Sequence, residues 1–390
     1  MPFLPFRIDF SDRAIEDLHR RLEDTRWPDT GWDTGWTTGT DDSVLRDLVR
    51  YWSNDFDWRK QEAALNARAH VRGVIDGDEM HAMLMAGPGS ERRTPVLLIH
   101  GWPGSFVEFT EAGERLVAGV DGAPGLDVVV PSLPGFGFSD VPRAPGLHPG
   151  RIAERLHLLM RELGYERYGV QGGDWGAIIG TVLARQHPEA VIGLHLNFAA
   201  GAPPPLEGAP ISEAEQAYRA SRQRFEVEET GYSRIQGTRP QTLGYALNDS
   251  PVGLLAWILE KFWAWADHGD DLWDRLDRDR VLTNVTLYWL TGHILSASRI
   301  YYERSHATEQ AMGRIPDEVP VGYAKFPAEP WAAPREVMER AGRLVHYSEP
   351  ARGGHFAAFE EPELFARDVA TFFAGLGPRL PAPQGVRILT

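Results

Sequence analysis

The sequence predicts an α/β domain with a mainly parallel sheet, preceded by a separate N-terminal region and interrupted by a block of helices. From residue 95 onward, apolar and β-branched runs alternate with helical stretches, a pattern typical of parallel strands that helices cover on both faces. Residues 211–318 are then mainly helical and rich in aromatic side chains. Strand-like sequence returns after residue 318, so the helical block is expected to be an insertion into one sheet.

The chain begins with a short strand-like segment, RIDF at residues 7–10. Ser11 follows it and is a candidate N-cap, because its hydroxyl can accept a hydrogen bond from an N–H of the first helical turn. The amphipathic pattern after Ser11 predicts a helix that extends to about Thr25.

The rest of the N-terminal region contains a loop, a helix and a hairpin. Residues 28–42 are dense in Gly, Asp and Thr, and we expect the tryptophans of this loop to pin it onto a surface. A second helix is predicted at 43–53. Residues 70–85 predict a β-hairpin that turns at Asp76-Gly77.

Six apolar runs predict the remaining strands, at residues 95–101, 126–135, 168–174, 191–198, 321–328 and 343–349. A Pro- and Gly-rich stretch at 201–210 marks the start of the helical block, and Ser212 with Glu215 forms a capping-box pattern just after it. The predicted division is an N-terminal region, a first part of the core, a helical lid, and a second part of the core with a C-terminal tail, at 1–90, 91–200, 201–318 and 319–390.

Composition excludes several classes of function. The net charge of −15 over 390 residues makes binding to a phosphate backbone unfavourable, so no nucleic-acid partner is expected. The absence of cysteine excludes thiol catalysis, disulfides and cysteine-ligated metals. The longest apolar run, 251–266, is too short to span a bilayer and contains Glu260 and Lys261. With no secretory signal either, a soluble cytoplasmic protein without a membrane anchor is expected.

The most informative motif is GGDWG at residues 172–176, between a predicted strand and a predicted helix. A small–x–nucleophile–x–small sequence at such a turn is the nucleophile elbow, in which small flanking residues let strand and helix approach closely. Its central residue is Asp174, whereas a serine stands at this position in G-x-S-x-G enzymes. The alternative is that Asp174 only caps the following helix.

Other residues complete a catalytic constellation. Trp102, in the HGWP loop after a strand, and Trp175, directly after Asp174, are the expected backbone donors of an oxyanion hole. His355, after the last strand, is the candidate base, and Glu329, one strand earlier, is the candidate acid that orients it. The order nucleophile, acid, histidine is that of the α/β-hydrolase fold, here with an N-terminal meander and an inserted helical lid.

The remaining histidines are expected to be structural or exposed. His100 is expected to organise the HGWP loop, His187 to end a helix and His195 to lie within an apolar strand. No HExxH motif and no tight cluster of His and carboxylate residues is present, so neither a metal nor another cofactor is expected.

An aspartate at the elbow selects the electrophile. Attack by a carboxylate on an alkyl carbon leaves an ester that a His-activated water can hydrolyse, whereas a serine would leave an inert ether. Epoxides and alkyl halides are therefore the expected substrates. An epoxide oxygen leaves as an alkoxide and needs a proton donor, a role that tyrosine can fill at neutral pH. The lid offers six tyrosines, at 218, 232, 245, 288, 301 and 302, and spacing alone leaves the donor open.

At this point the chain resembles the microsomal-type epoxide hydrolases, including the juvenile-hormone and fungal members. The motifs that carry the resemblance include HGWPGSFVEF, PSLPGFGFSD, GGDWG, SRIYYE, FPAE and RGGHFAAFEEPE, and it extends from residue 7 to about 372. The resemblance implies that Asp174 is the nucleophile, that Tyr232 and Tyr301 are the proton donors, and that Glu329 is the acid that orients the base His355.

The resemblance has three qualifications. Tyr302 is the alternative donor if the correspondence is shifted by one residue. Microsomal members carry an N-terminal membrane anchor, which is not carried over because this sequence starts at the region that follows it. The chain also looks similar to bacterial epoxide hydrolases that act on enediyne antibiotic intermediates.

The sequence thus predicts an epoxide hydrolase that forms a vicinal diol through an Asp174 ester, without a cofactor, on a small-molecule epoxide. The 13 tryptophans and the aromatic lid suggest a bulky or aromatic epoxide in a largely apolar pocket. Two alternatives stay open, a haloalkane dehalogenase and a non-catalytic α/β-hydrolase that binds a ligand. Stereochemistry, the attacked carbon and the formation of a homo-oligomer also stay open.

Overall fold

A nine-stranded mixed sheet forms the centre of the computed structural model, which describes residues 3–87, 93–199, 201, 203–205, 208, 210–308 and 313–377. The strands follow the order β1-β2-β3-β5-β4-β6-β7-β8-β9. Their bounds are β1 Leu4–Phe6, β2 Ala69–Ile75, β3 Asp78–Met85, β4 Pro95–Ile99, β5 Asp127–Pro131, β6 Tyr168–Gly172, β7 Val191–Leu196, β8 Pro320–Ala324 and β9 Arg343–Ser348.

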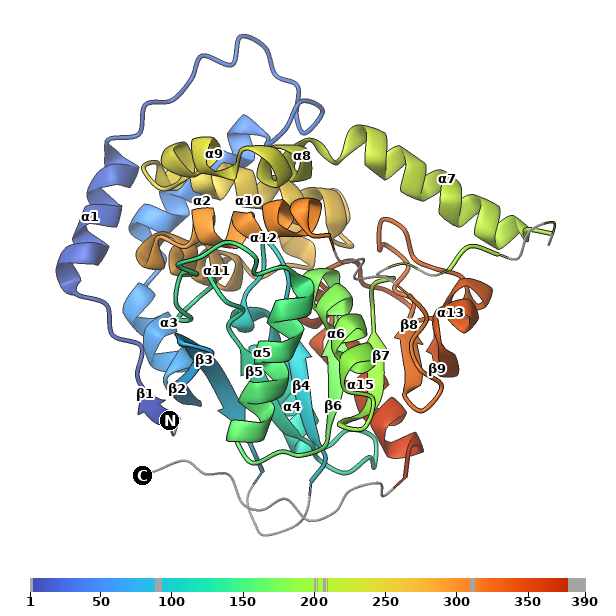
Figure 1. Cartoon of the computed structure of the whole chain (residues 1–390). Helices are drawn as coiled ribbons and strands as arrows, with labels where there is room; N and C mark the ends of the chain where they lie inside the picture. The colour runs from blue at the N-terminus through green and yellow to red at the C-terminus, as the bar shows by residue number, and fades with distance from the viewer. Residues whose placement is uncertain are drawn as a thin grey trace.

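In the order of the sheet, the six strands from β5 through β4, β6, β7 and β8 to β9 pair in parallel, as the alternation of apolar runs and helices predicts. Every residue of β4, β6, β7 and β8 is buried, which explains why these strands read as continuous apolar runs. Helices α5 and α6 pack together on one face, and α4 and α15 on the other (Figure 1). The helices of this core are α4 Thr110–Ala118, α5 Pro149–Glu162, α6 Asp174–Gln186, α13 Arg335–Ala341, α14 Ala357–Glu360 and α15 Pro362–Gly375.

The predicted N-terminal hairpin is confirmed, and it extends the same sheet. Strands β2 and β3 pair antiparallel around Asp76 and Gly77, whose φ angles of 51° and 88° suit a tight hairpin turn. Strand β3 also pairs antiparallel with β5. The expected helices are present as α1 Asp12–Glu23, with Ser11 as its N-cap, and α2 Asp42–Asn54, and a third helix, α3 Trp58–Leu65, follows.

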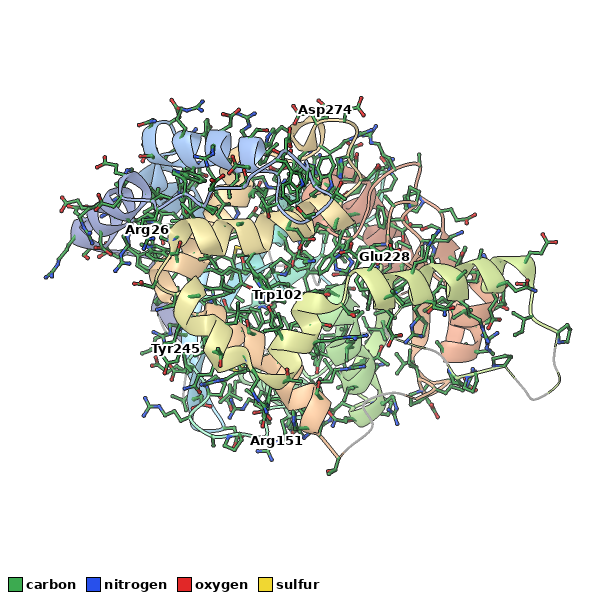
Figure 2. All side chains as sticks on the ribbon, turned by 90° about the horizontal axis from the view of Figure 1, so that it is seen from above. Arg26, Trp102, Arg151, Glu228, Tyr245 and Asp274 are labelled. Carbon is green, nitrogen blue, oxygen red and sulfur yellow. The ribbon has the colours of Figure 1, made fainter. Side chains whose placement is uncertain are left out.

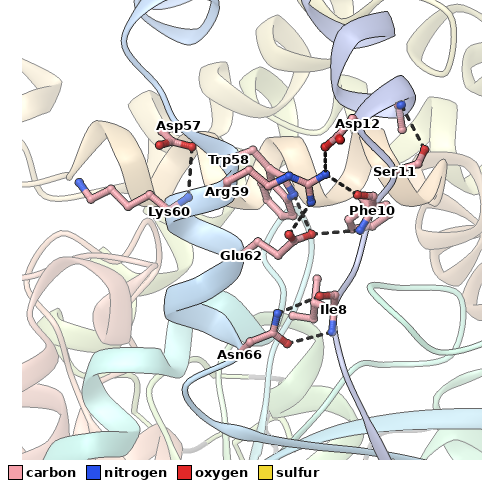
Figure 3. Close-up of polar contacts among 11 residues, drawn as sticks. Ile8, Phe10, Ser11, Asp12, Asp57, Trp58, Arg59, Lys60, Glu62 and Asn66 are labelled. Atoms are coloured by element: carbon pink, nitrogen blue, oxygen red, sulfur yellow. Dashed lines mark hydrogen bonds and ion pairs between the residues drawn. The ribbon is translucent and has the colours of Figure 1, made fainter.

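The prediction of a strand at residues 7–10 is wrong, because β1 ends at Phe6. Side chains of α3 and its C-cap bind this backbone in place of a neighbouring strand (Figure 3). The Asn66 amide accepts from the Ile8 N–H at 2.9 Å and donates to the Ile8 carbonyl at 2.8 Å. The Glu62 carboxylate accepts from the Phe10 N–H at 3.0 Å. An extended segment whose backbone groups bind side chains in this way does not need the hydrogen bonds of a neighbouring strand.

The lid lies above the sheet and consists of helices from the predicted insertion (Figure 1). Its helices are α7 Glu213–Glu228, α8 Gly231–Thr238, α9 Pro240–Leu247, α10 Pro251–Trp265, α11 Arg278–Thr291 and α12 Ile294–His306. Helix α7 projects outward over β8, β9 and α13 (Figure 1). Among the helices that the structure describes, none combines the length and the apolar character needed to cross a bilayer.

The capping box at the start of α7 is only half formed. Ser212 caps the helix by accepting from the Glu215 N–H at 3.0 Å. The Glu215 carboxylate, however, binds Arg340 of α13 and Arg219, each at 2.8 Å. Two guanidinium partners outcompete one backbone N–H because hydrogen bonds between charged groups are stronger. This ion pair fastens the outer end of α7 to the core.

The N-terminal loop lies on the lid, as its tryptophans predict. The Trp36 ring stacks on Trp263 of α10, with a centroid distance of 4.5 Å and an interplanar angle of 3°. Trp32, in contrast, is 76% exposed and does not contribute to this anchoring. The division at residues 90, 200 and 318 stays a prediction, and the tail from residue 378 lies outside the described residues.

Candidate active site

Asp174 occupies the predicted elbow between β6 and α6, with a φ angle of +48° that non-glycine residues rarely adopt. The neighbouring residues must be glycines because other parts of the backbone approach them closely. A Cβ on Gly172 would lie 2.2 Å from the Gly176 carbonyl oxygen, and a Cβ on Gly176 would lie 1.9 Å from the Ile99 carbonyl oxygen. The turn therefore holds the Asp174 carboxylate above the end of the sheet in a strained backbone conformation.

The loop after β4 contacts this carboxylate directly. The Trp102 N–H donates to Asp174 Oδ1 at 2.8 Å, the geometry expected of an oxyanion-hole donor. Trp175, the other predicted donor, is buried at the start of α6. Lid side chains fix the loop, since Asn284 and Tyr288 of α11 donate to the carbonyls of Pro103 and Gly104, both at 2.8 Å.

His355 lies between two carboxylates. Its Nδ1 is 2.8 Å from Glu329 Oε2 and its Nε2 is 3.3 Å from Asp174 Oδ2. Burial alone would lower the pKa of His355, but the two carboxylates outweigh burial and raise this pKa well above its ordinary value. The three residues that the sequence assigns to a triad therefore lie in one contact chain.

The loop that carries His355 is also bound to the lid. The His355 N–H donates to the Trp265 carbonyl at the end of α10, at 3.0 Å. Glu360 supports the loop, since its carboxylate accepts from the Asp267, Gly354 and Phe356 N–H groups at 2.7 to 2.8 Å. Burial raises the pKa of Glu360 to about 7, although these three donors oppose the rise.

Tyr232 and Tyr301 come from the lid helices α8 and α12 and lie next to each other, with ring centroids 5.6 Å apart. The Tyr232 ring stacks on Trp102, and the Tyr301 ring meets Trp175 edge to face at 4.7 Å. Burial and then the Asp174 carboxylate raise the pKa of Tyr232, and burial raises the pKa of Tyr301 well above its ordinary value. Both phenols therefore hold their protons at neutral pH. The Tyr301 hydroxyl is buried and has no hydrogen-bond partner among the described residues.

Tyr302 lies elsewhere. Its ring stacks on His306 at 3.9 Å, and its side chain lines a separate cavity between α9, α12 and the loop before α5. Adjacent residues of a helix point in directions about 100° apart, and here Tyr301 lines the active-site cavity whereas Tyr302 lines the other one. The other lid tyrosines lie outside the polar centre of the site; Tyr288 binds Gly104 and Tyr245 is 71% exposed.

A cavity of about 300 Å³ joins the Asp174 carboxylate, the two tyrosines and His355. Its walls are largely aromatic, with Phe198, Phe225, Trp265 and Trp331 among the lining residues. Figure 2, which looks down on the lid, shows Trp102 near the middle of the molecule and Glu228 at the end of α7 that is turned toward it. In the part of the chain that the structure describes, His and carboxylate side chains form no group suited to holding a metal ion.

The sequence alone does not point to Glu108, which borders a second, much smaller cavity of about 20 Å³ behind the nucleophile. Asp174, His355 and Asn197 line the same space, which is large enough for one water molecule. Burial and the charge of Asp174 raise the pKa of Glu108 to about 8, so its carboxyl is neutral near pH 7. The signal in the sequence is an acidic residue inside the apolar run FVEF.

Three other histidines, His100, His187 and His195, have the structural positions that the sequence predicts. Burial lowers the pKa of His100 to about 4, and its Nε2 accepts from the Leu133 N–H at 3.1 Å, which fixes the two loops together. His187 is the C-cap of α6. His195 lies buried in β7 and contacts Asp368 at 2.9 Å.

Comparisons with known proteins identify the family of the chain. Residues 3–109 match the family model described as epoxide hydrolase N terminus, and residues 94–229 match the alpha/beta hydrolase fold. The chain is 42% identical to an inferred epoxide hydrolase of Stigmatella aurantiaca (strain DW4/3-1), over 95% of this chain and 85% of that protein. It is 37% identical to epoxide hydrolase 1 of Sus scrofa, over 94% of this chain and 88% of that protein.

A solved structure extends the comparison to the fold. The epoxide hydrolase of Aspergillus niger superposes with a TM-score of 0.86 at 31% identity, covering 96% of this chain and 97% of that one. These relatives give no support to the expected similarity to enediyne-pathway enzymes or to the dehalogenase and ligand-binding alternatives. The chain therefore belongs to the microsomal-type epoxide hydrolase family, in which an epoxide hydrolase N-terminal region precedes an α/β-hydrolase domain, and it is an epoxide hydrolase.

Proposed function

We propose that Asp174, His355, Glu329, Tyr232 and Tyr301 convert the epoxide to a vicinal diol in two chemical steps. The observation that carries the proposal is the contact chain from Glu329 through His355 to Asp174, which faces two protonated tyrosines across one cavity. The residue roles are those that the sequence predicts, and each has a geometric requirement that can be stated atom by atom.

In the first step, Asp174 Oδ2 attacks a ring carbon and the bond from that carbon to the epoxide oxygen breaks. Oδ1 is the oxygen held by the Trp102 N–H, so Oδ2, which lies 3.3 Å from His355 Nε2, is the oxygen that forms the new bond. Tyr232 and Tyr301 donate hydrogen bonds to the departing oxygen, and a phenol proton neutralises it. The product is an alkyl ester of Asp174, and Oδ1 becomes its carbonyl oxygen.

Ester formation also converts His355 into a base. In the resting enzyme the charges of Glu329 and Asp174 raise the pKa of His355, which favours the imidazolium. The ester carries no charge, so one of the two causes of the raised pKa disappears when the alkyl-enzyme forms. His355 can then release its proton, which restores the phenol that was deprotonated in the first step, and Glu329 keeps the imidazole oriented with Nε2 toward the ester.

In the second step, His355 Nε2 takes a proton from water, and the hydroxide attacks the ester carbonyl carbon. The oxyanion forms at Oδ1 and is stabilised by the Trp102 N–H and, in this proposal, by the Trp175 N–H. The diol oxygen leaves with the proton that His355 took, and the second proton of the water passes from the new Asp174 carboxyl group to His355. Asp174 is thereby restored as a carboxylate with one oxygen from water, and His355 as an imidazolium. The aromatic walls of the cavity support a bulky or aromatic epoxide as the substrate.

The test is one turnover in water enriched in heavy oxygen, with enzyme in excess over an aryl epoxide. We expect the label in the peptide that contains Asp174 and an unlabelled first diol, both measured by mass spectrometry. A label in the first diol with none in the peptide would contradict the ester mechanism, because water would then have attacked the epoxide directly.

A further inference from the structure

Two arginines of the lid line the active-site cavity without a function in the mechanism above. Arg304 lies on α12, three residues beyond Tyr301 and therefore on the same face of the helix. Arg222 lies on α7, closer to solvent. Within the described residues, neither guanidinium forms an ion pair with a carboxylate.

The Arg304 guanidinium is partly satisfied. Its Cζ lies 5.8 Å from the centre of the Trp175 ring, which is a cation–π contact. Its Nη1, however, is buried and has no hydrogen-bond partner among the described residues. Burial and the nearby charge of Arg222 both lower the pKa of Arg304. A buried N–H of a cation without an acceptor is costly, so this donor is suited to a ligand that fills the cavity.

Lys261, another cation close to the cavity, is neutralised by carboxylates of the protein. Lys261, beside Tyr232, lies 2.5 Å from Glu260 and 3.6 Å from Glu229. The chain has 55 acidic residues against 40 basic ones, so a shortage of acidic residues does not explain why these two arginines lack a carboxylate partner among the described residues. Arg222 instead lies over the Trp331 ring, at 6.0 Å from its centre. The two carboxylates that do line the cavity are both engaged, because Asp174 and Glu329 contact His355.

We propose that the substrate is an epoxide that also carries a carboxylate, and that Arg304, assisted by Arg222, binds this carboxylate. The proposal rests on the proposed function, because it requires the epoxide ring to lie against Asp174 and the tyrosines at the other end of the cavity. A planar guanidinium binds a carboxylate through two parallel hydrogen bonds, which a neutral substrate cannot offer. The cavity volume of about 300 Å³ is at the lower end for ligand pockets, so the spacer between the two groups is compact.

The test uses three probes of one shape: styrene oxide, its para-carboxylate, and the methyl ester of that acid. Diol formation gives kcat and KM for the wild type, Arg304→Gln, Arg222→Gln and the control Arg299→Gln. Arg299 lies on α12 as well, but lines the separate cavity that contains Tyr302. We expect the wild type to prefer the acid over the ester by about tenfold in kcat/KM, the effect of one hydrogen bond between charged groups.

Arg304→Gln should remove most of this preference through KM and leave the ester within about twofold, and Arg222→Gln should remove less because the residue is exposed. Arg299→Gln should match the wild type. Arg304→Lys keeps the charge and should retain part of the preference for the acid. This variant tests the proposal if Arg304→Gln does not fold.

A wild type that prefers the ester overturns the proposal. So does an equal loss on acid and ester in Arg304→Gln, since Arg304 would then only order Trp175. Turnover of styrene oxide without turnover of the acid rejects the carboxylate and leaves the epoxide mechanism intact. No diol from any of the three probes would instead contradict the proposed function itself.

Discussion

The Tyr232 ring lies nearly parallel to the Trp102 ring, with an interplanar angle of 9° and a centroid distance of 5.1 Å. Tyr232 belongs to the lid and Trp102 to the loop after β4, whose N–H binds the Asp174 carboxylate. A single residue of the core therefore contacts both the proposed nucleophile and a proposed proton donor. The separation of these two groups is fixed by ring packing, and the lid tyrosine cannot shift without disturbing Trp102.

The first prediction concerns the tyrosines. Tyr232→Phe and Tyr301→Phe should each slow alkylation of Asp174 by about 10- to 200-fold, since a hydrogen bond to a charged oxygen contributes about 1.5–3 kcal/mol. The double variant should be nearly inactive. Pre-steady-state fluorescence or quenched-flow measurement of the alkylation phase gives these rates. Tyr302→Phe is the matched control and should equal the wild type, because its ring contacts His306; a slow Tyr302→Phe with a normal Tyr301→Phe would reverse the assignment.

The second prediction separates the two chemical steps. His355→Gln should still be alkylated but should not hydrolyse the ester, because only the second step needs a base. Intact-protein mass after mixing with substrate should rise by the mass of one epoxide. Glu329→Gln should slow hydrolysis less, since His355 keeps its imidazole. Asp174→Asn serves as the control that forms no adduct, and an unmodified His355→Gln with native circular dichroism would argue that His355 is needed for attack.

The third prediction concerns Glu108 and pH. Its pKa is about 8 in the folded protein against 4.5 as the ordinary value, so the folded protein keeps a proton that the unfolded chain loses. The contribution of Glu108 to the free energy of unfolding is therefore fully present below pH 4.5 and is lost as the pH rises toward 8. The Glu108→Gln side chain does not titrate, so the stability of this variant does not fall for this reason. The free energy of unfolding of Glu108→Gln, measured in urea, should therefore rise relative to the wild type between these pH values. A constant difference over that range would contradict the raised pKa.

The fourth prediction concerns the loop that carries His355. Glu360→Gln replaces one acceptor oxygen by an N–H₂ group, which leaves at least one of the three backbone N–H groups of Asp267, Gly354 and Phe356 unsatisfied at a cost of about 1–3 kcal/mol. Thermal unfolding should occur at a lower temperature, and hydrogen exchange at Gly354 and Phe356 should be faster. Glu363→Gln is the control, because that side chain is 59% exposed and its ion pair with Arg367 lies at the surface. Equal exchange in the two variants would show that Glu360 does not hold the loop.

The sheet and the nucleophile elbow could be predicted from sequence because both depend on local patterns. Continuous apolar runs predict buried parallel strands, and the glycines around Asp174 are dictated by contacts within a few residues of the turn. The strand predicted at residues 7–10 is wrong for the opposite reason. Its backbone partners, Glu62 and Asn66, lie more than 50 residues away, and no local pattern marks their side chains as acceptors and donors for that segment.

The candidate site shows the same limit. Helical spacing places Tyr301 on the buried stripe of α12, but it could not establish that this stripe is turned toward Trp175 and the active-site cavity. Glu108 could be noticed as a charge in an apolar run, but its raised pKa depends on its distance from Asp174 in the fold. The capping box failed at Glu215 because Arg340, 125 residues later, provides a stronger partner.

The hydrogen bonds between lid and core have a consequence for how the enzyme can be altered. Trp265 accepts from the His355 N–H, and Asn284 and Tyr288 hold the HGWP loop, so the lid supports both halves of the catalytic machinery. The lid is therefore not an exchangeable module. A chimera that takes its lid from a relative would also need the matching HGWP and His355 loops, and the three segments should be exchanged, or redesigned, as one unit.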